Sequence, residues 1–256
     1  MNADLRIAHD EVHVWHASLL CAPAELQRFQ ELLSDDELSR AARFHFDCHR
    51  RRFIASRGLL RSLLGRYMST PPEELVFRYA RFGKPALCGA TPLRFNLSHC
   101  GDAMLLAISK DRELGVDIER IDCGLNVLAL AETVFSKLEL ATLRAIPPAQ
   151  RAKVFFNGWT RKEAFVKANG AGLSIPLSAF DVSMLPDQPA ALLQTRWERA
   201  EAARWSLQAL EAPNGFAAAL AVKGKLGRLR VFRMRSDFGF QDESFETNLQ
   251  QEQLSG

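Results

Sequence analysis

The sequence predicts an α+β fold built from two similar halves. A chain of 256 residues can bury one large core or two smaller ones. Its hydrophobic content of 47% and charged content of 25% are ordinary for a globular protein. Each half has a long helical pattern followed by strands, and the segments GDAMLLAIS (101–109) and NGFAAALAV (214–222) resemble each other. We therefore expect an N-terminal half over 1–112, a C-terminal half over 113–235 and an acidic polar tail over 236–256.

The first half should open with a strand, because apolar and polar residues alternate over 12–17 as in a half-buried strand. Ser34 and Glu37 fit a capping box that begins a helix. The helical pattern then runs to Met68 with one break near Asp47, and Pro71-Pro72 closes it. Strands are expected next at 75–81, 93–97, 103–109 and 114–119.

The second half continues with helical patterns and ends in strands. Helices are expected at 127–134 and 137–146, followed by a helix within 155–173 that leaves through Gly170 and Gly172. Strands should follow at 180–184, 205–209 and 216–222, with 229–234 as an edge strand.

Cysteine usage and the absence of long apolar runs point to a soluble, cytoplasmic protein. The five cysteines are scattered without a C-x-x-C pair, which disfavours a disulfide framework or a zinc site. Charged residues near the N-terminus disfavour a signal peptide. The longest apolar run, 216–222, is too short to span a bilayer, so no membrane association is expected.

Positive charge is concentrated in the body of the chain. The net charge is +3, and the residues after Arg235 contain five acids and no lysine or arginine. Removing those five negative charges leaves +8 for the body, which suits an anionic ligand or an acidic partner. Seven arginines and one acid lie between Arg40 and Arg61, and most of these arginines should form a solvated helix face. One or two of them are expected to touch an anion, because the guanidinium fork matches phosphate oxygens.

An aromatic residue, a carboxylate and an ammonium share one face of the helix within 155–173. Trp159, Glu163 and Lys167 are spaced four apart, which aligns them along that face. On its own this spacing also fits a Glu–Lys pair on a solvated surface, worth about 0.2–0.5 kcal/mol. The spacing therefore indicates a function only when it is combined with the other acidic and basic residues of the chain.

Two more carboxylates share one face of the strand expected at 114–119. Period two places Asp117 and Glu119 side by side, and Gly115 allows close backbone approach. A polar strand edge facing water is the plain alternative. Two carboxylates about 4 Å apart would repel by about 4 kcal/mol at a surface dielectric, so with Glu163 they call for a common cation. Ligation by oxygen alone favours Mg²⁺ first and Mn²⁺ next.

Basic residues complete a layout suited to phosphoryl transfer. Lys84, His99 and Lys167, together with the arginine-rich helix, fit a phosphate-bearing substrate. A cation cluster beside a basic clamp is typical of phosphoryl-transfer sites, where charge neutralisation and positioning carry catalysis.

Four segments, in order, resemble the Sfp-type 4′-phosphopantetheinyl transferases of the holo-carrier-protein synthase superfamily. They are Gly83-Lys84-Pro85, the segment FNLSH (95–99), the segment GVDIE (115–119) and the segment WTRKEAFVK (159–167) with Gly170 and Gly172 after it. The resemblance spans roughly residues 34 to 222.

The resemblance implies two α/β halves related by a pseudo-two-fold axis, with the active site in the cleft between them. It implies transfer of the 4′-phosphopantetheine group from coenzyme A to a serine hydroxyl of an apo acyl or peptidyl carrier protein domain, releasing 3′,5′-ADP. Such enzymes serve fatty-acid, polyketide or nonribosomal-peptide biosynthesis. The long form of the family implies a monomer, with no role for nucleic acid.

The same resemblance assigns roles by position. Asp117, Glu119 and Glu163 would hold Mg²⁺, Glu163 would take the serine proton directly or through a water, and Lys167 would neutralise charge on the diphosphate. The residues expected to bind coenzyme A are Arg52, Lys84, Pro85, Ser98, His99, Lys162 and Lys167, with Arg40 and Arg43 as further candidates. For Lys162 and Trp159, burial or helix packing would serve equally well. The carrier protein is expected to dock around 98–102 and 127–146.

Two other functions fit parts of the pattern. A different Mg²⁺-dependent phosphohydrolase or nuclease also uses clustered acids and basic residues, but it leaves the ordered motifs unexplained. A catalytically inactive module that binds carrier proteins would tolerate the change Glu163→Gln, whereas the transferase would not.

Overall fold

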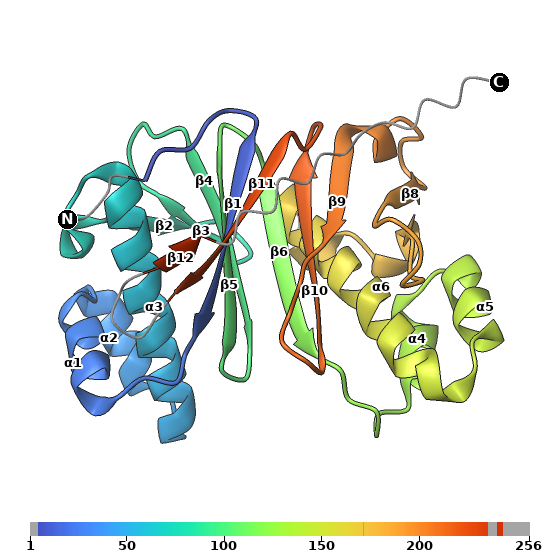
Figure 1. Cartoon of the computed structure of the whole chain (residues 1–256), viewed down its shortest axis with the longest axis horizontal. Helices are drawn as coiled ribbons and strands as arrows, with labels where there is room; N and C mark the ends of the chain where they lie inside the picture. Colours follow the sequence, from blue (N-terminus) through green and yellow to red (C-terminus); the bar gives the residue numbers. More distant parts are fainter. Residues whose placement is uncertain (1–4, 171, 235–239, 243–256) are drawn as a thin grey trace.

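Two β-sheets face each other in the middle of the molecule, and helices cover both outer faces (Figure 1). The structure is a computed structural model that describes residues 5–170, 172–234 and 240–242. Figure 1 shows α1 to α3 on the side of the first sheet and α4 to α6 on the side of the second. The mixed α+β class predicted from the sequence is confirmed.

The first sheet has the strand order β12-β11-β1-β5-β4, in which β1 and β11 run parallel and the other neighbours antiparallel. Its strands are β1 (Glu11–Ser18), β4 (Leu93–Cys100), β5 (Ala103–Lys110), β11 (Arg228–Met234) and β12 (Phe240–Asp242). The helices on its outer face are α1 (Pro23–Glu31), α2 (Asp35–Ala42) and α3 (Asp47–Met68).

The second sheet has the order β6-β10-β9, all antiparallel. Its strands are β6 (Leu114–Arg120), β9 (Trp205–Ala209) and β10 (Phe216–Lys223), and its helices are α4 (Val127–Val134), α5 (Lys137–Ala145) and α6 (Pro148–Asn169). Two small antiparallel pairs join β2 (Phe77–Tyr79) with β3 (Pro85–Leu87) and β7 (Phe180–Val182) with β8 (Leu192–Thr195).

The two sheets share a hydrophobic core, which holds the halves together. Val14 and Leu105 of the first sheet belong to the same buried cluster as Val116 and Leu220 of the second. This second layer explains one difference from the sequence prediction. The strand expected to be half-buried, β1, is buried on both faces over its first six residues, because α3 covers one face and the second sheet covers the other.

Several predicted boundaries shift for identifiable reasons. Helix α6 begins at Pro148, where proline is tolerated at the first helical position, and ends at Asn169, followed by Gly170 in the left-handed region with φ of 74°. Strand β11 is not an edge strand, since it pairs with β1 on one side and β12 on the other. Helix α1 carries no side-chain N-cap and was not predicted. The acidic tail over 236–256 lies outside the described residues except for β12.

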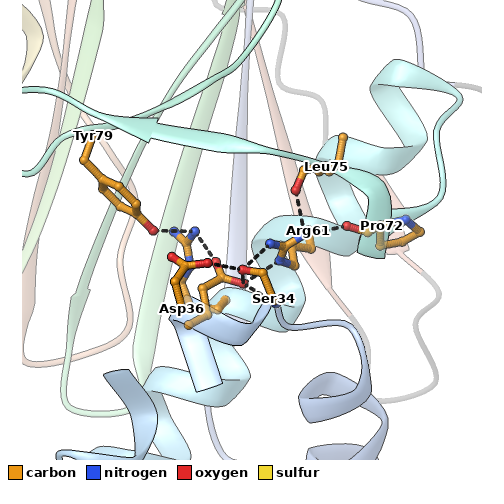
Figure 2. A network of polar contacts seen from close by, with 8 residues as sticks. Ser34, Asp36, Arg61, Pro72, Leu75 and Tyr79 are labelled. Atoms are coloured by element: carbon orange, nitrogen blue, oxygen red, sulfur yellow. Dashed lines mark hydrogen bonds and ion pairs between the residues drawn. The ribbon is translucent and has the colours of Figure 1, made fainter. Parts of the chain in front are cut away.

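A buried ion-pair network fixes α2 against α3 (Figure 2). Glu37 closes the predicted capping box of α2, and its carboxylate also contacts the guanidinium groups of Arg57 and Arg61. All three side chains are almost fully buried. These two arginines are therefore not part of the solvated helix face expected from the sequence.

The same network holds the segment that leads into the hairpin formed by β2 and β3. Arg61 donates hydrogen bonds of 2.9 Å to the carbonyl oxygens of both Pro72 and Leu75. Arg57 donates to the Tyr79 hydroxyl at 3.2 Å. Figure 2 labels Tyr79 and draws a dashed line at its hydroxyl group. The hairpin that carries Lys84 is thus anchored to α3.

No helix in the described part of the chain is both long and apolar enough to cross a bilayer.

Candidate active site

The site is built where β6 of the second sheet meets the last turns of α6. At Gly115, a β-carbon would lie 2.2 Å from the carbonyl oxygen of Ala164 and 2.4 Å from the backbone nitrogen of Ala168. Any larger residue would force the strand and the helix apart. Glycine at this position therefore brings Asp117 of β6 next to Glu163 and Lys167 of α6.

Asp117, Ser98 and Lys167 form a closed triangle of polar contacts. The Lys167 ammonium lies 2.5 Å from Asp117 Oδ1 and donates to Ser98 Oγ at 2.9 Å. The Ser98 hydroxyl in turn donates to Asp117 Oδ1 at 2.9 Å. These residues come from β4, β6 and α6, so the triangle joins the first half to the second.

Asp117 has one carboxylate oxygen that is not satisfied. The residue is 2% exposed, and its Oδ2 is buried without a hydrogen-bond partner. An unpaired buried acceptor of this kind costs about 1–3 kcal/mol. A cation bound to Asp117 Oδ2 would remove this cost.

Glu119 and Glu163 are close enough to Asp117 to feel its charge. Burial, and then the negative charge of Asp117, raise the pKa of Glu119 above its usual value. Burial, and then Asp117, likewise raise the pKa of Glu163, and Glu119 adds to this effect. The Lys167 ammonium lowers both pKa values. The cluster therefore carries an excess of negative charge over its one ammonium.

The oxygen donors of the three carboxylates are of the type that a hard divalent ion prefers. Their side chains, however, are not positioned to coordinate one ion together. In the described residues no three Asp, Glu, His or Cys side chains are gathered tightly enough to hold a metal ion as they stand. The unpaired Asp117 oxygen and the mutual repulsion of the carboxylates both favour a cation at this position. Binding would require side-chain movements, with Lys167 the group nearest to Asp117.

His99 and Arg52 lie on the side of the site facing the turn between β4 and β5. Partial burial, and then the charges of Lys167 and Arg52, lower the pKa of His99 below its usual value of 6.5, although the residue keeps an exposed surface. His99 is thus neutral at physiological pH. Arg52 is paired with Asp102 at 2.7 Å. An anion at this point would compete with Asp102 for the guanidinium group.

Lys84 is held by backbone oxygens. Its ammonium donates to the carbonyl of Lys167 at 2.8 Å and to that of Leu114 at 3.1 Å. Lysine near a helix C-terminus stabilises the unpaired carbonyls there. Lys84 therefore ties the β2–β3 hairpin to the end of α6 and the start of β6.

A polar cavity of about 440 Å³ lies beside Lys84. Pro85 lines it, and so do two arginines for which the sequence analysis made no proposal, Arg78 and Arg94. Glu113 also lines it, 3.8 Å from both the Lys84 ammonium and the Arg94 guanidinium. The basic lining suits an anionic group.

Lys162 was grouped with the coenzyme-A-binding residues from the sequence, and the structure corrects that assignment. Its side chain is fully buried, and its ammonium contacts the carbonyl oxygens of Leu177 and Phe180 and the Glu139 carboxylate at 2.8 Å. Adjacent residues on a helix point in different directions, so Lys162 cannot face the site with Glu163. Trp159 stacks on Phe155 in the core of the second half.

Arg40 and Arg43 lie at the end of α2, and both side chains are exposed. The Arg40 guanidinium covers the ring of Phe53 at 5.2 Å. Within the described contacts, nothing connects either residue to the Ser98–Asp117–Lys167 triangle.

Asn96 is a structural member of the site that the sequence analysis did not single out. Its side-chain oxygen accepts a hydrogen bond of 2.9 Å from the backbone nitrogen of Val116. This contact links β4 to β6 next to Asp117. The signal was present, because strand periodicity places Asn96 on the same face as Ser98.

Comparisons with known proteins agree with the motifs. One family model, described as the 4′-phosphopantetheinyl transferase superfamily, matches residues 113–221, and another, described as 4′-phosphopantetheinyl transferase, N-terminal, matches residues 15–111. The chain is 40% identical over 224 residues to the 4′-phosphopantetheinyl transferase HetI of Nostoc sp., covering 86% of this chain and 91% of the relative. It is 33% identical over 171 residues to the 4′-phosphopantetheinyl transferase psf-1 of Bacillus pumilus, covering 67% of this chain and 72% of the relative.

Among solved structures, an ACPS–CoA complex of Chronobacterium ammoniagenes matches 44% of this chain and 98% of its own, with 23% identity and a TM-score of 0.33.

Proposed function

Because the chain belongs to the 4′-phosphopantetheinyl transferase superfamily, we propose that it transfers the phosphopantetheine group of coenzyme A to a carrier-protein serine, releasing 3′,5′-ADP. The acceptor would be an apo acyl or peptidyl carrier domain, and the reaction would depend on Mg²⁺. The observation that carries the proposal is the Ser98–Asp117–Lys167 triangle, beside which lie two further carboxylates with raised pKa values.

The phosphate groups of coenzyme A would lie over this triangle. The Lys167 ammonium and the Ser98 hydroxyl can both turn from Asp117 to phosphate oxygens, because each is a flexible donor. Asp117, Glu119 and Glu163 would hold Mg²⁺, which when bound neutralises charge on the diphosphate and favours departure of 3′,5′-ADP.

Glu163 would serve as the base. The serine oxygen attacks the phosphorus that carries the pantetheine arm, the bond from this phosphorus to 3′,5′-ADP breaks, and the serine proton passes to Glu163 directly or through a water. A raised pKa moves a carboxylate toward the working pH, which makes it a better proton acceptor. The half-buried position of Glu163 is compatible with that role.

The nucleotide end would be bound by basic residues on either side of Ser98. Neutral His99 can donate a hydrogen bond to a phosphate oxygen, and Arg52 can exchange its partner Asp102 for an anion. The cavity lined by Arg78 and Arg94 offers a second basic surface. Lys84 would act by fixing the end of α6 that carries Lys167.

The carrier protein would dock near α4 and α5, beside the cleft. Leu125 and Leu138 are large apolar side chains that are 41% and 57% exposed in this region. A basic body favours an acidic partner by electrostatic steering. We further propose that the protein works as a monomer, since residues of both halves contribute to the one triangle. We also propose that it works in the cytoplasm, as its scattered cysteines suggest.

Intact-protein mass spectrometry tests the proposal. Purified apo-carrier protein incubated with this protein, coenzyme A and Mg²⁺ should gain one phosphopantetheine, and EDTA should abolish the gain. Glu163→Gln should lower the rate by about 10²–10⁴-fold, the usual contribution of general-base catalysis. The matched change Glu31→Gln, at an exposed position of helix α1, should leave the rate unchanged. No gain of mass across acyl and peptidyl carriers, or a gain that survives chelation, would contradict the proposal.

A further inference from the structure

We propose that the Lys167 ammonium is a built-in competitor for the metal ion and that it couples ion binding to diphosphate binding. In the substrate-free protein the ammonium occupies Asp117, so a divalent ion alone binds weakly. A diphosphate offers the ammonium other oxygens and releases Asp117 to the ion. This inference rests on the proposed function, because it concerns the same carboxylates.

The first step of the argument is that Lys167 is fully engaged inside the protein. An ammonium group has three hydrogens to donate. The described acceptors of Lys167 Nζ are Asp117 Oδ1 at 2.5 Å, Ser98 Oγ at 2.9 Å and the carbonyl oxygen of Val116 at 3.4 Å. The lysine therefore occupies Asp117 Oδ1, one of the two oxygens that a bound cation would use.

The second step is that this single charge does not balance the site. Three carboxylates, those of Asp117, Glu119 and Glu163, lie where β6 meets α6, and among the described ion pairs only the Lys167 ammonium contacts one of them. One oxygen of Asp117, Oδ2, has no hydrogen-bond partner. The cluster thus retains an attraction for further positive charge while its best-placed carboxylate is already occupied.

The third step is that a divalent ion bound at Asp117 and the Lys167 ammonium would repel each other. An ion that binds Asp117 comes within a few ångströms of Lys167, and like charges at that separation repel strongly in a partly buried site. The side chain of Lys167 is 29% exposed, and its four-carbon stem allows the ammonium to turn toward the cleft. Phosphate oxygens in the cleft would give it a new partner and remove the competition.

The consequence is positive coupling between the divalent ion and coenzyme A. Coupling between two sites typically changes each affinity by a factor of about 5 to 150, and the factor is the same in both directions. We expect a factor of at least about ten here, because one full charge on Asp117 is exchanged. The ion should therefore enter together with, or after, the diphosphate.

Titration of Mn²⁺ into the full chain without any diphosphate tests the competition, with free Mn²⁺ followed by electron paramagnetic resonance. Lys167→Met should bind Mn²⁺ at least about tenfold more tightly than the unmodified protein. The control Lys153→Met removes the same charge from an exposed position on the same helix, and it should change the affinity by less than about twofold. Equal or weaker Mn²⁺ binding by Lys167→Met would overturn the inference.

The second arm repeats the titration with saturating coenzyme A. The unmodified protein should gain at least about tenfold in Mn²⁺ affinity, and Lys167→Met should gain much less, since the competitor is already gone. Lys167→Arg keeps the charge and should resemble the unmodified protein without coenzyme A. If coenzyme A raises the affinity equally in both proteins, Lys167 is not the coupling residue.

Two further measurements separate this inference from the proposed function. If Asp117→Asn abolishes Mn²⁺ binding while Lys167→Met leaves it unchanged, the metal site stands and the competition is wrong. If no protein binds Mn²⁺ even with coenzyme A, both fail. Thermal unfolding guards against a misfolded variant, because Lys167→Met should melt lower than the unmodified protein without metal and should gain more from Mn²⁺.

Discussion

Replacing Gly115 with alanine tests how strictly the site depends on the close contact between β6 and α6. The added β-carbon would lie 2.2 Å from the Ala164 carbonyl oxygen, whereas ordinary contacts begin at 3.4 Å. The strand and the helix must therefore separate by about 1 Å. Neither neighbour can yield as a flexible side chain would, because the atoms in contact are backbone atoms of the helix.

The expected cost follows from this geometry. Overpacking a tight contact typically costs about 1–3 kcal/mol, which corresponds to a fall in melting temperature of about 2–12 °C for a protein of this size. The separation would also move Asp117 away from Lys167 and Glu163 by a similar distance. A misplacement of about 1 Å in an active site can cost about 10²-fold in rate.

The assay is the rate of phosphopantetheine transfer to an apo-carrier protein, measured at a temperature where the variant is fully folded by circular dichroism. Gly124→Ala is the matched control, since it adds the same methyl group in an exposed turn whose nearest atom is a side-chain oxygen of Asp122 at 3.3 Å. A folded Gly115→Ala protein with an unchanged rate would refute the claim that this contact positions the site. An unchanged melting temperature would refute the packing argument itself.

Three more outcomes are expected. Glu37→Gln should lower the free energy of unfolding in urea by about 3–5 kcal/mol, because it leaves two buried arginines unpaired, whereas Asp36→Asn on the exposed side should change it little. Lys162→Met should also lower the free energy of unfolding but leave coenzyme A affinity by calorimetry unchanged; weakened binding in a folded variant would restore the ligand role expected from sequence. His99 has a lowered pKa, so the folded protein binds fewer protons there than the unfolded chain, and the free energy of unfolding decreases as pH falls below 6.5. His99→Gln should reduce this decrease, and an unchanged pH dependence of stability would contradict the lowered pKa of His99.

Local patterns in the sequence predicted the parts of the fold that short-range physics determines. The capping box at Ser34 and Glu37, the strand containing Asp117 and the four-residue spacing of Glu163 and Lys167 are all present in the structure. Period two on a strand and spacing of four on a helix decide which side chains share a face. Those rules sufficed to place Asp117 and Glu119 on one face of a strand and Glu163 and Lys167 on one face of a helix, but not to bring the strand and the helix together.

These rules do not predict contacts between segments that are far apart in the sequence. The β1 strand was expected to face water on one side, and only the packing of a second sheet explains its double burial. Lys84 was expected to contact a ligand, and its contact with the carbonyl of Lys167 depends on how the hairpin folds over α6. Neither contact leaves a periodic signal in the sequence.

Lys162 is different, because the sequence held enough information to question its assignment. It directly precedes Glu163, and consecutive helical residues cannot face the same site. Residues three and four positions further along, Phe165 and Val166, are apolar and share its side of the helix. Helical geometry therefore favours the packing role that the sequence analysis kept open for Lys162.

The most direct measurement is the mass of an apo-carrier protein after incubation with coenzyme A, Mg²⁺ and the Asp117→Asn protein. Asp122→Asn, an exposed aspartate five residues further along the chain, provides the comparison. We predict that the Asp122→Asn protein adds phosphopantetheine at the unmodified rate and that the Asp117→Asn protein, folded by circular dichroism, adds none on the same time scale. Comparable transfer by both proteins would contradict the role given to the carboxylate at the junction of β6 and α6.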